Sequence, residues 1–310
     1  MIIYHEHKQI DIEKWDRCIA NSKNSYIYAY SWYLNIVAGE WDALIEDDYV
    51  SVFPLPHRKK FGLKYIYQPT LTQQLGLFSI KEISSSKIHD FIMAIPNEFS
   101  LTEINLNIHN PVIEHNLYSF VDNKNIELNL SADYNTLKQS YSKNLKRNIN
   151  KARKNSLSIS NNIKPELIID LFKKNKGAKV KGFSKDDYNR IIQLIYLLIS
   201  NNLVDISAAY SKENTLLGGI FILKDKNRFI FIFSGLSQEG KDKGAMPLLV
   251  NNFIEKTCNS NIIFDFEGSN TASIARFFMS FGAKEVHYKG LRYYQLKPAL
   301  KSLLKIIGKI

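Results

Sequence analysis

The chain has 310 residues, 45% of them hydrophobic, and carries a formal net charge of +11 at pH 7. This length allows two domains with cores of ordinary size, and the apolar content excludes a mostly disordered chain. The only cysteines, Cys18 and Cys258, lie far apart and lack metal-ligand spacing, so we expect neither a disulfide framework nor a metal site. Residues 1–15 lack a signal-peptide pattern, and no apolar run reaches the ~18 residues of a membrane span. These features predict a cytoplasmic protein.

The first part of the chain alternates helical and strand patterns up to a polar segment at residues 122–125. We expect helices at 15–19, 30–37 and 87–94, and strands at 43–46, 50–55, 64–67 and 101–107. Amides and hydroxyls crowd the block at 65–78 and are candidates for orienting an acceptor substrate: Gln68, Thr70, Thr72, Gln73 and Gln74. A loop held by its own side-chain hydrogen bonds is the alternative.

After the polar segment we expect a strand at 126–130 and one long helix at 134–155. Seven basic residues and no acidic one lie between Lys138 and Lys154. On a helix, Lys143, Lys146 and Arg147 fall on adjacent turns of one side, an arrangement suited to binding the phosphates of a substrate. An ordinary solvated basic face is the alternative.

The apolar run at 228–236 predicts a buried strand that leads through a glycine- and lysine-containing loop into a helix starting near 244. Unpaired N–H groups at such a helix start favour phosphate binding. Our candidate donor-binding residues are Ser234, Gly235, Gly240, Lys241, Lys243, Gly244, Ala245 and, at the start of the next helix, Asn270. A solvated loop in front of a helix is the alternative.

A second strand is expected at 262–266, where alternation sends Asp265 and Glu267 to the same face. Parallel strands joined by a helix hold ligands at their carboxyl ends, which is where Glu267 falls. The two carboxylates are therefore our candidate catalytic groups. Capping of the next helix, or pairing with a lysine, is the alternative for Glu267.

Several segments resemble the FemABX-like branch of the GNAT N-acyltransferases. They are SYSKNLKRNINKARKNSLSI at 140–159, FDFEGSN at 264–270, IARFFMSFGAKEVHY at 274–288 and, in the first half, YIYQPTLTQQLGLF at 65–78. The resemblance implies an α/β fold with a mixed sheet and two tandem GNAT-like domains. These would span residues 1–125 and 126–297, and a basic amphipathic tail at 298–310 would follow.

Two features depart from the GNAT pattern. The glycines of QEGKDKGA are displaced from their usual spacing in the acyl-CoA loop, and Phe278 stands where many GNAT enzymes have a tyrosine that acts as general acid. The FemABX-like branch does not depend on that tyrosine.

The resemblance implies direct transfer of an acyl group to an amine, with no covalent enzyme intermediate and no metal. Acyl-CoA is the expected donor, with backbone groups of residues 229–234 polarising its carbonyl and Glu267 or Asp265 accepting the amine proton. One alternative is transfer from aminoacyl-tRNA to a peptidoglycan-precursor amine in the bacterial cell envelope. Another is a basic binding module without activity. The tail either lies on an anionic membrane surface or docks on its own domain.

Overall fold

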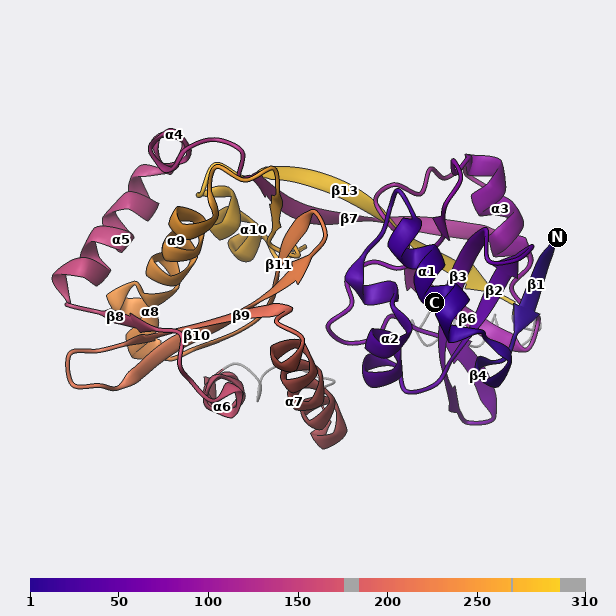
Figure 1. Ribbon diagram of the computed structural model, residues 1–310, viewed down its shortest axis with the longest axis horizontal. Coiled ribbons are helices and arrows are strands. Elements are labelled where there is room, and N and C mark those ends of the chain that lie inside the picture. The colour runs from indigo at the N-terminus through magenta and orange to yellow at the C-terminus, as the bar shows by residue number, and fades with distance from the viewer. Residues whose placement is uncertain (176–183, 269, 296–310) are drawn as a thin grey trace. The chain divides into compact units, whose positions relative to one another are not determined.

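The structure is a computed structural model that describes residues 1–175, 184–268 and 270–295 (Figure 1). The expected tail at 298–310 lies outside the described residues. Two compact units are present: among the described residues, unit 1 comprises 1–123 and 287–295, and unit 2 lies within Lys124–Val286. The chain enters unit 2 within β7 (Tyr118–Asn129) and leaves it within β13 (Lys284–Tyr294). The segment from His287 thus belongs to unit 1, although we expected it in the second domain.

Unit 1 is a sheet flanked by helices. Its further elements are β1 (Ile2–His5), η1 (His7–Gln9), α1 (Ile12–Asn21), η2 (Ile27–Ala29), α2 (Ser31–Val37), β2 (Trp41–Glu46), β3 (Ser51–Lys60), β4 (Leu63–Ile66), β5 (Phe78–Ser79), α3 (Ser85–Met93) and β6 (Phe99–Asn105). The sheet order is β1-β2-β3-β4-β6-β13-β7, with β5 on β3. β1 to β4 are antiparallel neighbours, whereas β6 is parallel to β4. The helices and strands predicted for this part of the chain are confirmed.

Unit 2 repeats this plan. Its elements between β7 and β13 are α4 (Tyr134–Gln139), α5 (Lys143–Lys154), β8 (Ser158–Ser160), α6 (Pro165–Asn175), α7 (Lys185–Ser200), β9 (Val204–Tyr210), β10 (Leu216–Asp225), β11 (Arg228–Leu236), α8 (Gln238–Lys243), α9 (Ala245–Thr257), β12 (Ile263–Asp265) and α10 (Ala272–Met279). The order is β13-β7-β12-β11-β10-β9-β8. β9 to β11 are antiparallel, and β12 is parallel to β11.

Each unit therefore places a parallel strand after an antiparallel series, with a helix between the two parallel strands. In unit 1 the parallel pair is β4 and β6, joined through α3; in unit 2 it is β11 and β12, joined through α9. Such a helical crossover is what parallel neighbours require. The mixed sheet and the tandem arrangement predicted from the sequence are confirmed.

Helices cover both faces of the sheet in unit 2 (Figure 1). One face carries α5, α9 and α10, whose buried side chains form one core with β7 and β10 to β12. The other face carries α6 and α7. The apolar spacing of Leu145, Ile149 and Ala152 explains why α5 presents one buried face to that core and a basic face to solvent.

The single long helix expected at 134–155 is wrong, because two helices occupy that range. Asp133 caps α4, and Ser142 caps α5 by accepting a hydrogen bond from the N–H of Leu145 at 3.1 Å. The N–H of Ser142 donates to the carbonyl of Ser280 at 2.9 Å instead of continuing a helical ladder. Serine competes well for a cap position, so the chain restarts there. None of the helices in the described ranges has the length and apolar character to cross a bilayer.

Candidate functional site

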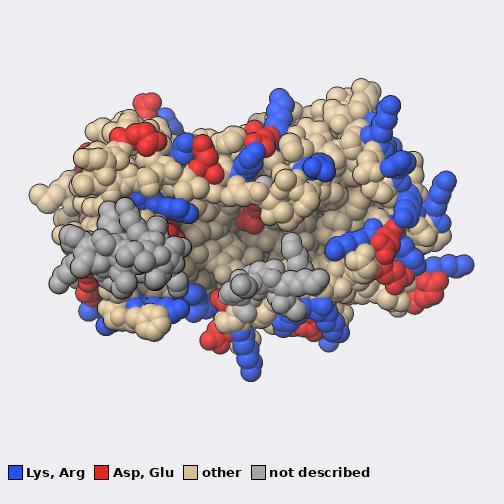
Figure 2. Space-filling model, turned by 180° about the vertical axis from the view of Figure 1, so that it is seen from behind, with Lys and Arg blue, Asp and Glu red and all other residues tan. Residues whose placement is uncertain are grey.

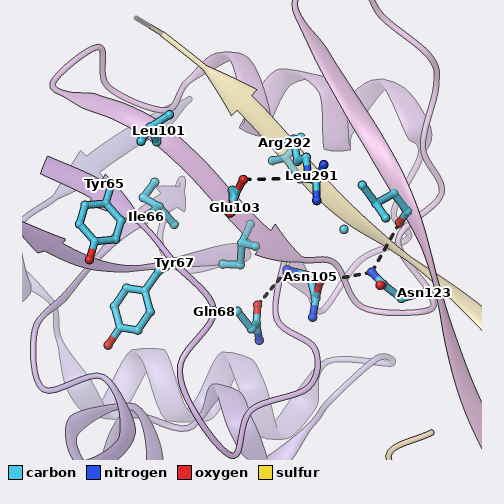
Figure 3. Close-up of a pocket in the computed structure, with 13 residues that line it drawn as sticks. Tyr65, Ile66, Tyr67, Gln68, Leu101, Glu103, Asn105, Asn123, Leu291 and Arg292 are labelled. Carbon is cyan, nitrogen blue, oxygen red and sulfur yellow. Dashed lines mark hydrogen bonds and ion pairs between the residues drawn. The ribbon is translucent and has the colours of Figure 1, made fainter. Parts of the chain in front are cut away.

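A pocket of about 530 Å³ lies in unit 1 where the two parallel strands end (Figure 3). Pairing between β4 and β6 stops at Ile66 and Thr102, and the chain segments then separate. Tyr65 and Tyr67 line one side of the pocket, and Arg292 lies on another. The full lining is Tyr65, Ile66, Tyr67, Gln68, Leu101, Glu103, Ile104, Asn105, Val121, Asn123, Gly290, Leu291 and Arg292.

Amide side chains hold the pocket edge together. The Oε1 of Gln68 accepts from the backbone N–H of Asn105 at 2.8 Å, and its Nε2 donates to the carbonyl of Thr72 at 2.7 Å. Asn105 Nδ2 in turn donates to the carbonyl of Gln73 at 2.9 Å. Gln68 therefore lines the pocket, as a substrate-binding residue should, while its amide fixes the loop. The side-chain hydrogen bonds named as the alternative for this block are present.

The remaining predicted acceptor-binding residues differ in exposure. Gln74 is fully buried and its Oε1 accepts from the N–H of Ile108 at 2.7 Å, so it supports the loop and cannot touch a substrate directly. This corrects our expectation for Gln74. Thr70 and Gln73 are half-buried, and the Oε1 of Gln73 accepts from Gln74 Nε2 at 2.8 Å.

Sequence patterns did not predict the charged residues that line this pocket. Arg292 on β13 lies with its Nε 4.0 Å from Oε1 of Glu103 on β6, and Tyr294 donates to the same oxygen at 2.7 Å. Burial, with the bond to Glu103, raises the pKa of Tyr294 to about 12, so its hydroxyl stays protonated at neutral pH. Because β13 returns from the far end of the chain, no local spacing signals this pairing.

In unit 2 a buried ion-paired cluster joins three strands. Arg228 Nη1 donates to Glu127 Oε1 at 2.6 Å and to Asp265 Oδ2 at 2.9 Å. Asp265 is 1% exposed. Burial raises its pKa to about 6; Arg228 opposes this rise and Glu127 adds to it. Asp265 does not emerge at the surface as a catalytic group, which corrects our expectation for it.

Glu267 lies two residues past the carboxyl end of β12. Its φ is +51°, in the left-handed region, and its N–H donates to Asp265 Oδ1 at 2.8 Å. The strand alternation that would place both carboxylates on one face therefore ends at Asp265. Glu267 is half-buried, and Asp265 holds its backbone in place.

Phenylalanine rings fill the region beyond the last parallel pair of unit 2. Pairing of β11 with β12 ends at Ile230 and Asp265. Phe231 and Phe266 then follow, and their ring centroids lie 5.5 Å and 4.6 Å from that of Phe278 on α10. Phe278, the residue in place of the GNAT tyrosine, is thus a core side chain, 7% exposed.

The loop predicted to cradle donor phosphates is instead the short helix α8 followed directly by α9. Gly235 packs against the backbone of α6, and a Cβ on Gly240 would lie 2.2 Å from the carbonyl oxygen of Leu217. Gly244 links the two helices with φ +81°, and a Cβ there would lie 2.5 Å from the carbonyl oxygen of Asn148. The glycines therefore allow close backbone packing, which corrects their role as an open cradle.

The other predicted donor-binding residues are dispersed. Ala245 is fully buried, Lys241 is exposed on α8, and Lys243 pairs with Glu239 at 2.7 Å. Ser234 lies within β11 opposite Ile220.

Asn270 accepts from the backbone N–H of Lys124 at 3.1 Å, so it ties the segment after β12 to β7. Such a bond gives Asn270 a structural role.

The basic residues of α5 form an exposed face. Lys143 and Arg147 are exposed, Lys146 is half-buried, and Lys146 Nζ donates to the carbonyl of Gln139 at 3.1 Å. Figure 2 shows Lys and Arg side chains along the edge of unit 2 to which α5 belongs, on the right of that view. In the described ranges no group of three or more His, Cys, Asp or Glu side chains has an arrangement that could hold a metal ion.

No protein-family model and no curated protein sequence matches this chain. Solved structures do match: FemX has a TM-score of 0.66 at 11% identity, over 98% of this chain and 99% of its own. The fold is that of FemX. L-PGS from Bacillus licheniformis matches with a TM-score of 0.52 at 10% identity, over 97% of each chain. A C-terminal domain (DUF2156) of a putative lysylphosphatidylglycerol synthetase from Agrobacterium fabrum matches with 0.56 at 8% identity, over 93% of this chain and 92% of its own. The FemABX-like fold expected from the sequence is confirmed.

Proposed function

We propose that the protein is an acyltransferase that moves an acyl or aminoacyl group from an activated donor directly to an amine. The observation that carries the proposal is the match to FemX over nearly all of both chains, with a diverging parallel pair in each unit. One fold can host more than one chemistry, so the role of each residue depends on its own position.

The reaction needs one proton acceptor. The amine nitrogen attacks the donor carbonyl carbon, and the bond from that carbon to sulfur or oxygen breaks. The departing group keeps the electron pair and takes up one proton from solvent, and the amine gives up one proton, which its acceptor later returns to solvent. We assign that proton to Glu267, a half-buried carboxylate past the carboxyl end of β12. Asp265 acts as a positioning residue, because it accepts the N–H of Glu267.

We place aminoacyl-tRNA first as the donor and acyl-CoA second, the reverse of the expectation from sequence. The packed Gly240 of α8 and Gly244 between α8 and α9 support this order, since they remove the open loop that was expected to hold pyrophosphate. The Agrobacterium fabrum neighbour is named for a lysyl-containing product, which also supports an aminoacyl donor. The exposed basic face of α5 suits an RNA backbone.

We propose that the unit 1 pocket holds the acceptor. Its volume of about 530 Å³ is that of a small-molecule site, and its lining combines tyrosine rings with amides and one neutralised Glu103–Arg292 pair. Such a lining suits a polar acceptor without a large net charge. A cell-envelope precursor amine is the acceptor class we expect.

A panel of donors tests this proposal by thermal shift, because a ligand that binds only the folded state raises the melting temperature. The panel contains acetyl-CoA, a long-chain acyl-CoA and charged tRNA, with free CoA and deacylated tRNA as controls. We expect charged tRNA to stabilise the protein in a salt-sensitive manner. Stabilisation by acyl-CoA alone would reverse our order of donors. If no donor raised the melting temperature, this result would contradict the proposed transferase activity and favour a binding module without activity.

A further inference from the structure

A second pocket, of about 520 Å³, lies in unit 2 between α5 and α10. It is separate from Glu267 and from the phenylalanines that fill the end of the parallel pair. The lining residues are Ser142, Asn144, Leu145, Asn148, Ser273, Arg276, Phe277, Met279 and Ser280.

The walls of this pocket carry positive charge, and none of the residues that line it is acidic. Helix α5 contains six basic residues and no acidic one, and α10 contains Arg276 and no acidic residue. Arg276 is exposed, and within the described ranges its guanidinium has no ion pair or hydrogen bond. Lys143, on the first turn of α5, is exposed and likewise has no ion pair there. Like charges on one helix repel, so an anion would be stabilised beside them.

Neutral hydrogen-bond donors stand next to these charges. Asn144 Oδ1 accepts from Arg147 Nη2 at 2.8 Å, which leaves the amide N–H groups of Asn144 free to donate. Asn148 and Ser273 add a second amide and a hydroxyl to the same pocket. An oxyanion with several acceptor oxygens can use a guanidinium together with such donors.

The rest of the lining is apolar. Leu145 is 2% exposed and Phe277 is half-buried against the same core, while Met279 is 38% exposed beside them. A ligand with an anionic group but no apolar part would leave this apolar surface exposed to water. The combination favours a molecule with an anionic head and an apolar or aromatic body.

We propose that this pocket binds a phosphate ester whose organic part is apolar or aromatic, with Arg276 on the phosphate and Phe277 and Met279 beneath the organic part. The planar guanidinium can bind phosphate in a bidentate manner that a lysine cannot reproduce. The basic face of α5 adds a positive electrostatic potential that favours a doubly negative phosphate group. The proposal does not depend on the transferase activity. A nucleotide and an anionic phospholipid share this chemistry, and the experiment distinguishes them.

Binding to the full chain is measured by isothermal titration with ADP and with a soluble short-chain phosphatidylglycerol. Adenosine and the matching diacylglycerol lack the phosphate and serve as ligand controls. We expect one phosphate ester to bind and its counterpart without phosphate not to bind. Which of the two binds identifies the source of the phosphate. Failure of both phosphate esters to bind would overturn the proposal.

Two variants test the assigned residue. Arg276→Gln should weaken binding about tenfold or more, as expected for loss of a charged hydrogen bond. Arg153→Gln removes the same charge from α5 outside the pocket lining and should change binding less than about twofold, as expected for an exposed charge. Ser273→Glu places an anion on the first turn of α10, which a helix start tolerates, and should abolish binding with the melting temperature unchanged. Equal effects of the two arginine variants, or undiminished binding by Ser273→Glu, would contradict the site.

Discussion

Arg228 of β11 and Asp265 of β12 form an ion pair across two parallel strands, with Nη1 and Oδ2 2.9 Å apart and only 1% of the Asp265 side chain exposed. The same carboxylate accepts the N–H of Glu267 through its other oxygen. The pair therefore fixes where the chain leaves β12, and so it positions Glu267, the proposed proton acceptor.

Arg228→Met should lower the free energy of unfolding by roughly 3–5 kcal/mol, because it leaves the buried Asp265 and the partly buried Glu127 without their cation. Urea denaturation measures this loss. Arg292→Met is the matched control: its side chain is 51% exposed and its pair is 4.0 Å long, so we expect less than about 1 kcal/mol. A loss below about 1 kcal/mol for Arg228→Met, as expected for the control, would contradict a stabilising role for the cluster around Asp265.

The stability contributed by Asp265 should depend on pH. Burial raises its pKa from the ordinary 3.8 to about 6, so the folded state binds this proton more tightly than the unfolded chain does. The contribution is fully present below about pH 4 and is lost as pH rises through about 6. The difference in the free energy of unfolding between wild type and Asp265→Asn should therefore increase by on the order of 2 kcal/mol as the pH falls from 7 to 4. A flat difference across that range would contradict the raised pKa.

Gly244→Ala should be clearly more destabilising than Gly62→Ala, although both glycines have nearly the same backbone conformation. Their φ values are +81° and +79°, but an added Cβ meets the carbonyl oxygen of Asn148 at 2.5 Å in the first case and nothing within 4 Å in the second. We expect about 1–2 kcal/mol for the left-handed conformation alone at Gly62 and about 1–3 kcal/mol more at Gly244. Thermal unfolding of both variants provides the comparison, and equal losses would mean that α5 and α8 can move apart without cost.

Local patterns predicted most of the fold. Pro247 and the apolar spacing after it located α9, and the apolar run at 228–236 predicted β11 with the limits it has in the structure. The break in the helix at 134–155 was missed because the spacing of Leu145 and Ile149 continues the helical period, whereas the cap at Ser142 depends on a bond to Ser280 far along the chain. Tertiary contacts override local propensity in such cases.

The site was harder to predict for the same reason. Asp265 and Glu267 alternate in sequence as if both faced one cleft, but Arg228 binds the first and the left-handed backbone of the second ends the strand. Arg292 of the unit 1 pocket arrives on a strand that returns to unit 1 from the other end of the chain. Glycines give the same sequence signal whether they approach a phosphate or a neighbouring carbonyl, so only the structure separates the two roles.

We propose that Glu267 accepts the amine proton during direct acyl transfer. The most direct test of this role is a comparison of wild type, Glu267→Gln and the matched surface control Glu239→Gln in single-turnover reactions. The readout is amine-dependent loss of the acyl or aminoacyl group from whichever donor binds. We predict that Glu267→Gln lowers the rate constant about 10²-fold or more with unchanged donor affinity and melting temperature, as expected for a lost general base, while Glu239→Gln matches wild type. Equal rates for all three proteins would contradict the assignment of Glu267, and no amine-dependent reaction in any of them would contradict the transferase itself.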